Sequence, residues 1–514
     1  MSARPLMIQG TASTCGKSLI TAALCRILKQ DGFRVAPFKA QNMSNNSFVT
    51  RNGLEMGRAQ VVQAIAAGIE PDVRMNPVLI KPSSDTGAQV VLNGKPAFTM
   101  DAKNWHDTRE RLRIEIRKAW ESIAAEYECV ILEGAGSPAE INLKKNDVVN
   151  MGMAAMADAP VILVGDIDRG GVFASLVGTM QLLDDNERKR VKGFIINKFR
   201  GDPGLLTSGL EQLEALTGVP VLGVVPWIEH SIDDEDGVSD RFDCTRPEPG
   251  SVDICIIRLP HISNFTDVIP LESVPGVTVR WCDRAAMFGT PDLCIIPGSK
   301  ATISDLRTLK QHGIADAIIN YARNGGTVLG ICGGFQMLGT EIADPDATES
   351  VNRHEPGLGL LAMHTRFHPE KTTLQTTATL HGEASWLFSE CGEKQVSGYE
   401  IHHGESVFAP ETTAFTSSLS TDGSSRITGI ASPTGRVLGS YLHGLFDSGE
   451  VTSGMINALR RSKNPDTKEH SVLDRTTSLD LELDRLAETV RNTCNLDAIY
   501  RILREWPRMV PLRI

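Results

Sequence analysis

Short apolar runs alternate with amphipathic segments over the first half of the chain. Each run has a mostly apolar core followed by turn residues, which is the pattern of a buried strand. Between the first two runs, residues 17–30 carry leucine, isoleucine and alanine at helical spacing on one face. Strands that alternate with helices predict a parallel sheet covered on both faces, with its ligand beyond the carboxyl ends of the strands. The expected strands are PLMIQG, FRVAPFKA, ECVILEGAG, APVILVGDID, VKGFIINKF and VPVLGVVP.

A second series of strands begins after residue 251. Residues 228–251 are acidic, carry Pro, Gly and Ser, and hold few apolar residues, which predicts a linker. Residues 448–514 have leucine and valine at helical spacing, from Leu479 to Val490. The sequence therefore predicts an α/β protein with two doubly wound domains, 1–227 and 252–447, and a helical tail that covers an edge of the second domain. The strands expected in the second domain are DICIIRL, GVTVRWC, DLCIIPG, GTVLGICGG and RVLGSYLHG.

Length and composition narrow the classes of function. A chain of 514 residues is too long for one core, and its 41% hydrophobic and 22% charged content is that of a globular protein. A formal charge of −11 argues against a nucleic-acid or anionic-membrane binder. The ten cysteines form no C-x-x-C pair, which favours a reducing compartment. The start of the chain has no apolar signal core and no long apolar run follows, so we expect a cytoplasmic protein.

Residues 10–18, GTASTCGKS, lie between the first expected strand and the first helix, where a phosphate-binding loop belongs. The common loop has four residues between its glycines, whereas five separate Gly10 from Gly16 here, and Thr11 follows the first glycine. Backbone N–H groups of such a loop cradle phosphates, Lys17 pairs with the terminal phosphates, and the Ser18 hydroxyl ligates Mg²⁺. The alternative is a glycine turn with a surface lysine. We interpret the first domain as a P-loop NTPase-like sheet that binds ATP with Mg²⁺.

Polar residues stand at the ends of the other strands of this domain. Glu133 would bind Mg²⁺ directly or through a bound water, or be a helix-capping or loop carboxylate. Lys39 would place a second positive charge on the transferring phosphate, or lie in solvent. Asn197 would read a base edge of ATP, or serve a turn. Asp166 and Asp168 would bind Mg²⁺ or substrate, or cap the next helix.

The second domain contains a nucleophile elbow with cysteine in the serine position. In VLGICGGFQMLG, Cys332 lies in a G-x-C-x-G turn between an expected strand and helix. A helix amino terminus lowers the pKa of a thiol, and the N–H of Gly333 can donate to an oxyanion. A second donor is expected from the PGS loop at Gly298. His443, just past the last strand, is the expected base. The alternative for the cysteine is a buried structural thiol, which is what we expect of the other nine.

These features resemble class I glutamine amidotransferases over residues 252–447. That class usually carries a carboxylate two residues after the histidine, but Leu445 stands there, so the resemblance implies a Cys–His dyad whose orienting residue is unassigned. His402 and His403 would line the glutamine pocket or be plain loop histidines. The shifted loop of the first domain resembles that of the dethiobiotin synthetase group. Those enzymes use ATP to turn a carboxylate into a mixed phosphoric anhydride, which a nitrogen nucleophile attacks.

The order of motifs resembles the cobyric acid synthase family over nearly all of residues 5–447. The motifs are the P-loop, FKAQNMSNNS, EMGRAQ, LEGAGSPAEINL, DIDRGGVFAS, INKFRGD, PGSK, GICGGFQMLG, GYEIH and YLHGLF. The resemblance implies ATP- and glutamine-dependent amidation of the b, d, e and g carboxylates of adenosylcobyrinic acid a,c-diamide, in cobalamin biosynthesis. The ammonia is expected to pass internally between the domains, because water would destroy the acyl phosphate. The related a,c-diamide synthases carry G-P-D-Y-I-D, which is absent here; such a synthase, or an amidoligase for another polycarboxylate, stays the alternative.

The resemblance also implies where the corrinoid substrate binds. Its contacts are expected around FKAQNMSNNS, with Asn42 and Asn45, and around DIDRGG, with Asp166 and Arg169. The dethiobiotin synthetase group has a Mg²⁺-binding aspartate near the second strand, where this chain has asparagines; Glu55 could substitute.

Two readings from other classes also stay open. A ParA-like partner-binding switch would carry the loop K-G-G-x-G-K, which is absent, and a free-standing cysteine hydrolase would turn over without ATP.

Overall fold

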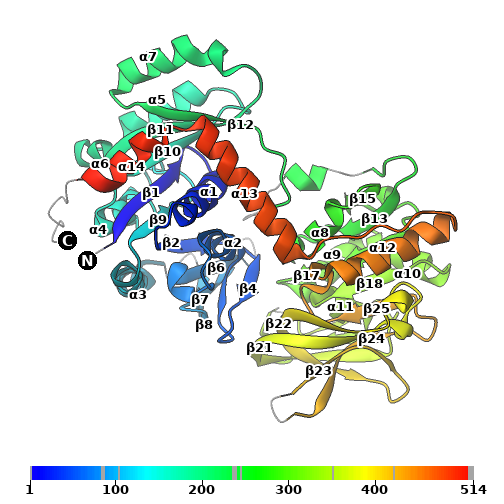
Figure 1. Cartoon of the computed structure of the whole chain (residues 1–514). Helices are drawn as coiled ribbons and strands as arrows, with labels where there is room; N and C mark the ends of the chain where they lie inside the picture. Colours follow the sequence, from blue (N-terminus) through cyan, green and yellow to red (C-terminus); the bar gives the residue numbers. More distant parts are fainter. Residues whose placement is uncertain are drawn as a thin grey trace.

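The structure is a computed structural model that describes residues 3–82, 87–101, 105–233, 240–243, 246–349, 352–420 and 423–506. It forms two α/β domains, and the chain returns to the first domain at its end (Figure 1). No helix of the described part is long and apolar enough to span a membrane.

The first domain is built on a six-stranded parallel sheet in the order β12-β11-β10-β1-β9-β2. The six strands predicted from the apolar runs are these six, so this part of the fold is confirmed. All six end on one edge of the sheet, which is where the phosphate-binding loop and the predicted polar residues lie. The strands are β1 (Arg4–Gly10), β2 (Val35–Phe38), β9 (Cys129–Glu133), β10 (Val161–Asp166), β11 (Val191–Phe199) and β12 (Val221–Pro226).

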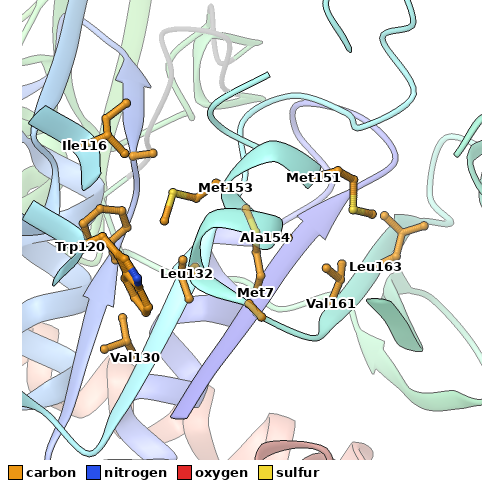
Figure 2. Close-up of a cluster of buried hydrophobic side chains, with 14 of the residues drawn as sticks. Met7, Ile116, Trp120, Val130, Leu132, Met151, Met153, Ala154, Val161 and Leu163 are labelled. Carbon is orange, nitrogen blue, oxygen red and sulfur yellow. The ribbon is translucent and has the colours of Figure 1, made fainter. Parts of the chain in front are cut away.

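Alternate residues of each strand enter cores on opposite faces of this sheet. Met7 and Leu163 belong to one buried cluster, whereas Leu6 and Ile8 belong to the other. Figure 2 shows the first cluster, in which Trp120 and the α4 methionines cover the sheet. Because both faces are covered, most of the buried positions of these strands are apolar. One face packs against α3 (Trp105–Glu126), α4 (Met151–Ala157), α5 (Val172–Leu182) and α7 (Thr207–Thr217), and the other against α1 (Lys17–Gln30) and α13 (Arg475–Thr493); α2 (Arg58–Ala67) contributes to both clusters, and α6 (Asp185–Arg190) precedes β11.

Residues 41–101 form two small sheets that the apolar pattern does not predict. One is the ribbon of β4 (Ser47–Val49) and β5 (Glu55–Gly57), and the other has the order β3-β6-β7-β8. These strands are short, and their sequences mix polar and apolar residues without a clear period. They lie between β2 and α3 at the side of the first domain that meets the second (Figure 1). The second sheet comprises β3 (Gln41–Met43), β6 (Val78–Pro82), β7 (Gly87–Leu92) and β8 (Lys95–Asp101).

The second domain has an eleven-stranded sheet whose parallel half was predicted and whose antiparallel half was not. The parallel half runs β15-β13-β16-β18-β25, with β13 (Val252–Ile257), β15 (Val277–Cys282), β16 (Leu293–Ile296), β18 (Val328–Ile331) and β25 (Val437–Ser440). The long hairpin of β21 (Met363–His381) and β22 (Glu393–Phe408) extends toward the first domain. The other elements are β14 (Ile262–Ser263), β17 (Gly298–Ser299), β19 (Glu341–Ala343), β20 (His354–Pro356), β23 (Thr413–Leu419), β24 (Ser425–Ala431), α8 (Ile269–Glu272), α9 (Thr302–Gln311), α10 (Ile314–Arg323) and α11 (Gly333–Leu338).

The tail divides between the two domains. Helix α12 (Gly449–Lys463) packs on the second domain, as predicted. The prediction is wrong for α13 and α14 (Leu496–Glu505), which return to the first domain. Leu483 and Val490 are fully buried in the core that α1 also forms, and α13 lies along α1 in Figure 1. An apolar helical face specifies that a helix must be covered, but not which domain covers it.

The segment between the domains is less free than its composition indicates. Ile232 and Asp233 are buried against the first domain, and Phe242 packs edge-on against Trp281 of the second. Residues of the predicted linker 228–251 therefore pack on each of the two domains. The boundaries predicted for the domains stay predictions.

Candidate active sites

The phosphate-binding loop begins where β1 ends and closes at the start of α1. Gly16 has a φ of 93°, and a Cβ placed on it would lie 2.1 Å from Nδ2 of Asn197, so only glycine fits there. The same Nδ2 donates to the Cys15 carbonyl at 2.9 Å. Lys17 reaches back over the loop, and its Nζ donates to the carbonyls of Ala12 and Ser13 at 2.8 Å each. Asn197 therefore stabilises the conformation of the loop, and its contact with the base of ATP stays a prediction.

A carboxylate cluster lies beside this loop. Oε1 of Glu133 accepts hydrogen bonds from Ser18 Oγ at 2.7 Å and Lys39 Nζ at 3.0 Å, and its Oε2 accepts one from Gln63 Nε2 at 2.5 Å. Glu133 is 1% exposed. The structure thus brings Ser18, Lys39 and Glu133 together as predicted, whereas Gln63 gave no signal in the sequence.

The donor set of this cluster fits Mg²⁺. A hydroxyl and a carboxylate converge, and Mg²⁺ in phosphate-transfer sites takes one or two such ligands and completes its shell with waters and phosphates. In the described part of the chain, no three His, Cys, Asp or Glu side chains gather into a site that holds a metal by themselves.

Two cavities meet at the loop. The P-loop cavity, of about 660 Å³, is lined by Lys17, Ser18, Arg169 and Asn197, and also by Leu486 of the tail. Arg169, expected near the substrate, thus lies on the nucleotide side, and Asp166 pairs with Lys198 at 2.9 Å. Asp168 pairs with Arg200.

The interdomain cavity, of about 1030 Å³, lies on the other side of the loop and is walled by both domains. The first domain contributes Lys39, Asn42, Asn45 and Asn46, as predicted for the substrate segment, and the second contributes Arg258, Arg284 and His312. Ser13 and Lys17 line this cavity as well as the P-loop cavity.

Glu55 does not join the Mg²⁺ cluster, so its prediction as a substitute ligand is wrong. Its carboxylate is bound by Lys81 at 2.6 Å and by Lys371 of the second domain at 2.7 Å. The two ammonium groups outweigh the effect of burial and hold the pKa of Glu55 well below its ordinary value. Its carboxylate forms an interdomain ion pair, whereas it is the carboxylate of Glu133 that the Ser18 hydroxyl meets.

In the second domain, Cys332 lies on a strained turn between β18 and α11. Its φ is 52° and its ψ is −108°, a conformation that a non-glycine residue adopts at a cost and that occurs at functional sites. A Cβ on Gly333 would lie 2.8 Å from the backbone N of Ser299. The elbow and the PGS loop are therefore in contact, as their predicted shared role at an oxyanion requires. A Cβ on Gly298 would lie 3.5 Å from Cε1 of His443, which places that loop beside the imidazole too.

The orienting residue left unassigned in the sequence is Asp267. Its Oδ2 accepts a hydrogen bond from Nδ1 of His443 at 2.7 Å, and both side chains are buried. Burial lowers the pKa of His443, but the charge of Asp267 and then that of Cys332 outweigh it and raise the pKa to about 10. The other ring nitrogen, Nε2, has no oxygen or nitrogen partner among the described residues and is left for the thiol.

A small cavity covers the thiol. This thiol cavity measures about 20 Å³ and is lined by residues of both domains, among them Cys332, His402, His403 and Lys81. Both histidines of the predicted pair thus line it. Burial, with the nearby charges of Lys300 and Lys371, lowers the pKa of His403 to about 3, so its ring is neutral at pH 7.

Family comparisons cover both domains. Residues 6–237 match the family described as the CobQ/CobB/MinD/ParA nucleotide binding domain, and residues 253–451 match the CobB/CobQ-like glutamine amidotransferase domain. The cobyric acid synthase of Salmonella agona (strain SL483) is 52% identical over 502 residues, which are 97% of this chain and 98% of that protein. The cobyric acid synthase of Salmonella typhimurium (strain LT2) is 52% identical over 504 residues, with the same two shares.

Similar solved structures are more distant. The structure of PurLQS from Thermotoga maritima aligns with a TM-score of 0.31 at 18% identity and covers 40% of this chain and 98% of its own. The signal recognition particle receptor FtsY from Elizabethkingia anophelis, in complex with GDP, aligns with a TM-score of 0.26 at 15% identity, covering 44% of this chain and 57% of its own. Both scores lie below 0.5, so nothing about this chain follows from them.

Proposed function

Because the chain belongs to the cobyric acid synthase family, we propose that it is the ATP-dependent ligase that amidates the b, d, e and g carboxylates of adenosylcobyrinic acid a,c-diamide with ammonia from glutamine. The observation that carries the placement of this chemistry is that Ser13 and Lys17 line both the P-loop cavity and the interdomain cavity. A phosphoryl group bound at the loop therefore borders the space in which an acceptor carboxylate can lie.

The second domain releases the ammonia. His443 first takes the proton of the Cys332 thiol at Nε2, and the sulfur then attacks the glutamine carboxamide. The oxyanion accepts hydrogen bonds from the Gly333 N–H and the loop at Gly298. His443 then protonates the leaving nitrogen, ammonia departs, and water hydrolyses the thioester to glutamate. Asp267 holds the imidazole by Nδ1 and balances its charge while it carries the extra proton.

The first domain activates the acceptor. A carboxylate oxygen attacks the γ-phosphorus of ATP, ADP leaves, and ammonia displaces phosphate from the resulting acyl phosphate to form the amide. Lys17 and Lys39 offset the negative charge that gathers on the transferring group. Ser18 and Glu133 would hold Mg²⁺, which supplies further neutralisation of the phosphates when bound.

The interdomain cavity is the proposed site of the corrinoid. Its volume of about 1030 Å³ is in the range of sites for large ligands, and asparagine amides line it on one side, with two arginines on the other. Asn42 and Asn45 would bind peripheral carboxylates and amides. Lys81 of the first domain lies in the wall of the thiol cavity, and ammonia released there is expected to pass between the domains, away from water. A cytoplasmic location suits a thiol that must stay reduced.

The proposal is tested by incubating the protein with glutamine, MgATP and candidate corrinoid acids while glutamate, ADP and one-amide mass changes are followed. A Cys332→Ala variant should lose glutamine use and keep amidation with high ammonia. Cys391→Ala, which removes another buried thiol of the same domain, is the matched control and should keep both. Glutamate release without an amide on any acid contradicts the proposal.

A further inference from the structure

Strand β4 belongs to the first domain but makes three hydrogen bonds to the second. The N–H of Ser47 donates to Oδ1 of Asn264 at 2.9 Å, and the Ser47 carbonyl accepts from the hydroxyl of Tyr399 at 3.2 Å. The carbonyl of Val49 accepts from Nε2 of Gln375 at 2.8 Å. Two of these three bonds are buried. The strand is thus fixed to the second domain along its length.

Tyr399, one of the partners of β4, contacts the proposed base. The ring of Tyr399 stacks on the imidazole of His443, with centroids 5.0 Å apart and planes 13° apart. The backbones of the two residues also exchange hydrogen bonds, at 3.2 and 2.9 Å. On the first-domain side, Phe48 of β4 packs edge-on against the same tyrosine ring at 5.4 Å. A displacement of β4 would therefore tilt the ring that lies on His443.

Asn264, another partner of β4, lies close in the chain to the residue that orients the base. Asn264 has a φ of 51° and begins the short 3₁₀ turn Phe265–Val268, which carries Asp267. The side chain of Asn264 holds Ser47 while its backbone sets the start of this turn. Tyr399, on the face of the imidazole, is thus bonded to β4 directly, and Asp267, at Nδ1, is connected to β4 through Asn264, three residues before it in the chain.

The other end of the connection lies at the proposed acceptor site. Residues Asn42–Asn46 line the interdomain cavity and run directly into β4. Lys81, a wall of the thiol cavity, donates to Ser47 Oγ at 3.0 Å. Since the thiol cavity of about 20 Å³ has room for about one water, a wall must move before glutamine can enter.

We propose that β4 is the element through which an acceptor in the interdomain cavity sets the geometry of His443, and that Tyr399 is the positioning residue at its end. The inference rests on the proposed function. An acceptor that binds Asn42–Asn46 better in one position of β4 shifts the population toward that position, and the tyrosine ring and the Asp267 turn shift with it. Ammonia is then released when an acceptor is present to receive it.

The test is a Tyr399→Phe variant, which keeps the stacked ring and removes the tie to the Ser47 carbonyl. In the wild type, glutamine hydrolysis should rise when MgATP and the corrinoid acid are added. In the variant this rise should be about tenfold smaller, in keeping with the loss of one buried hydrogen bond. The change should appear in kcat, with the KM for glutamine unaltered, and more glutamate should be released per amide formed.

A second variant and a control separate coupling from stability. Gln375→Ala frees the far end of β4 from an exposed position that does not touch His443, and it should reduce the rise in the same direction. Tyr321→Phe removes a hydroxyl that donates to the Pro291 carbonyl inside the second domain, and it should leave the rise as in the wild type.

Two results would overturn the inference. One is a wild-type rate of glutamine hydrolysis that does not respond to the acceptor, and the other is a rise in Tyr399→Phe equal to that in Tyr321→Phe. Ammonia-dependent amidation is measured in every variant, because it does not use the glutaminase residues Cys332 and His443. If it persists while the rise is unchanged, the coupling is refuted and the proposed function stands; if it is absent in the wild type, the proposed function fails with it.

Discussion

The replacement Asp267→Asn tests the part of the glutaminase that the sequence did not reveal. It preserves the shape of the side chain and removes the charge that the buried imidazole of His443 faces at 2.7 Å. Burial lowers the pKa of His443, yet Asp267 and Cys332 together raise it from 6.5 to about 10. At 1.36 kcal/mol per pH unit, this rise is worth about 5 kcal/mol in favour of the imidazolium, and Asp267 contributes the larger part.

Only part of this energy acts on the rate, because the thiol contributes to the rise as well. In a triad that keeps its geometry and loses its carboxylate, kcat falls about 10⁴-fold, and general base catalysis alone contributes about 10²–10⁴-fold. We therefore expect kcat for glutamine hydrolysis by Asp267→Asn to fall by about 10²- to 10⁴-fold. Glutamate release at saturating glutamine measures this, and amidation with high ammonia should match the wild type.

The matched control removes a different buried carboxylate from the same domain. Asp253 lies on β13 and is bound by Arg280 at 2.7 and 3.1 Å. Among the contacts of the described residues, none joins it to His443. Asp253→Asn should lower the free energy of unfolding and leave kcat of the folded enzyme in place. If Asp267→Asn loses no more glutaminase activity than Asp253→Asn, the assignment of Asp267 as the orienting residue is refuted.

Two further predictions concern stability. Burial raises the pKa of Asp233, but Arg475 and Arg58 outweigh burial and lower this pKa from 3.8 to about 2. The carboxylate therefore stabilises the fold above its ordinary pKa, and this stabilisation is lost as the pH falls from about 4 to about 2. Asp233→Asn should cost about 3–5 kcal/mol in urea unfolding at pH 7, and a deficit that does not shrink toward pH 2 would contradict this. Leu483→Ala should lower the free energy of unfolding by about 2–5 kcal/mol. It should weaken ATP binding more than glutamine hydrolysis, because α13 packs on the first domain. Leu481→Ala on the exposed face of the same helix is its control, and equal losses in the two would refute the docking of α13.

The parallel sheets could be predicted because each of their strands is recognisable from its own short stretch of sequence. Each strand is buried on both faces, so its run of apolar residues stands out, and in such sheets the chemistry follows the carboxyl end. That rule is enough to bring Ser18, Lys39 and Glu133 into one cluster without knowledge of the strand order. Likewise, the elbow at Cys332 could be recognised, because its turn needs small residues on both sides.

The residues that escaped prediction are those whose position depends on distant parts of the chain. Asp267 and His443 are 176 residues apart, and the aspartate lies in a short 3₁₀ turn with no pattern of its own. Strand β4 is three residues long, and its conformation is fixed by Asn264, Gln375 and Tyr399 of the other domain. For both, tertiary contacts override local preference, which a periodicity does not report.

The tail gives the two-domain arrangement a second covalent connection. The chain crosses from the first domain to the second once between β12 and β13, and it returns between α12 and α13. At the return point, Arg475 at the start of α13 binds Asp233, and Asp233 also binds Arg58 at the start of α2. The two crossings are thus joined to each other and to the helix that follows the β4–β5 ribbon. Because both crossings leave the first domain beside this buried pair, a rotation of the domains that opens the interdomain cavity would turn about it. Such a rotation would also have to break the hydrogen bonds that β4 makes with Asn264, Gln375 and Tyr399 of the second domain.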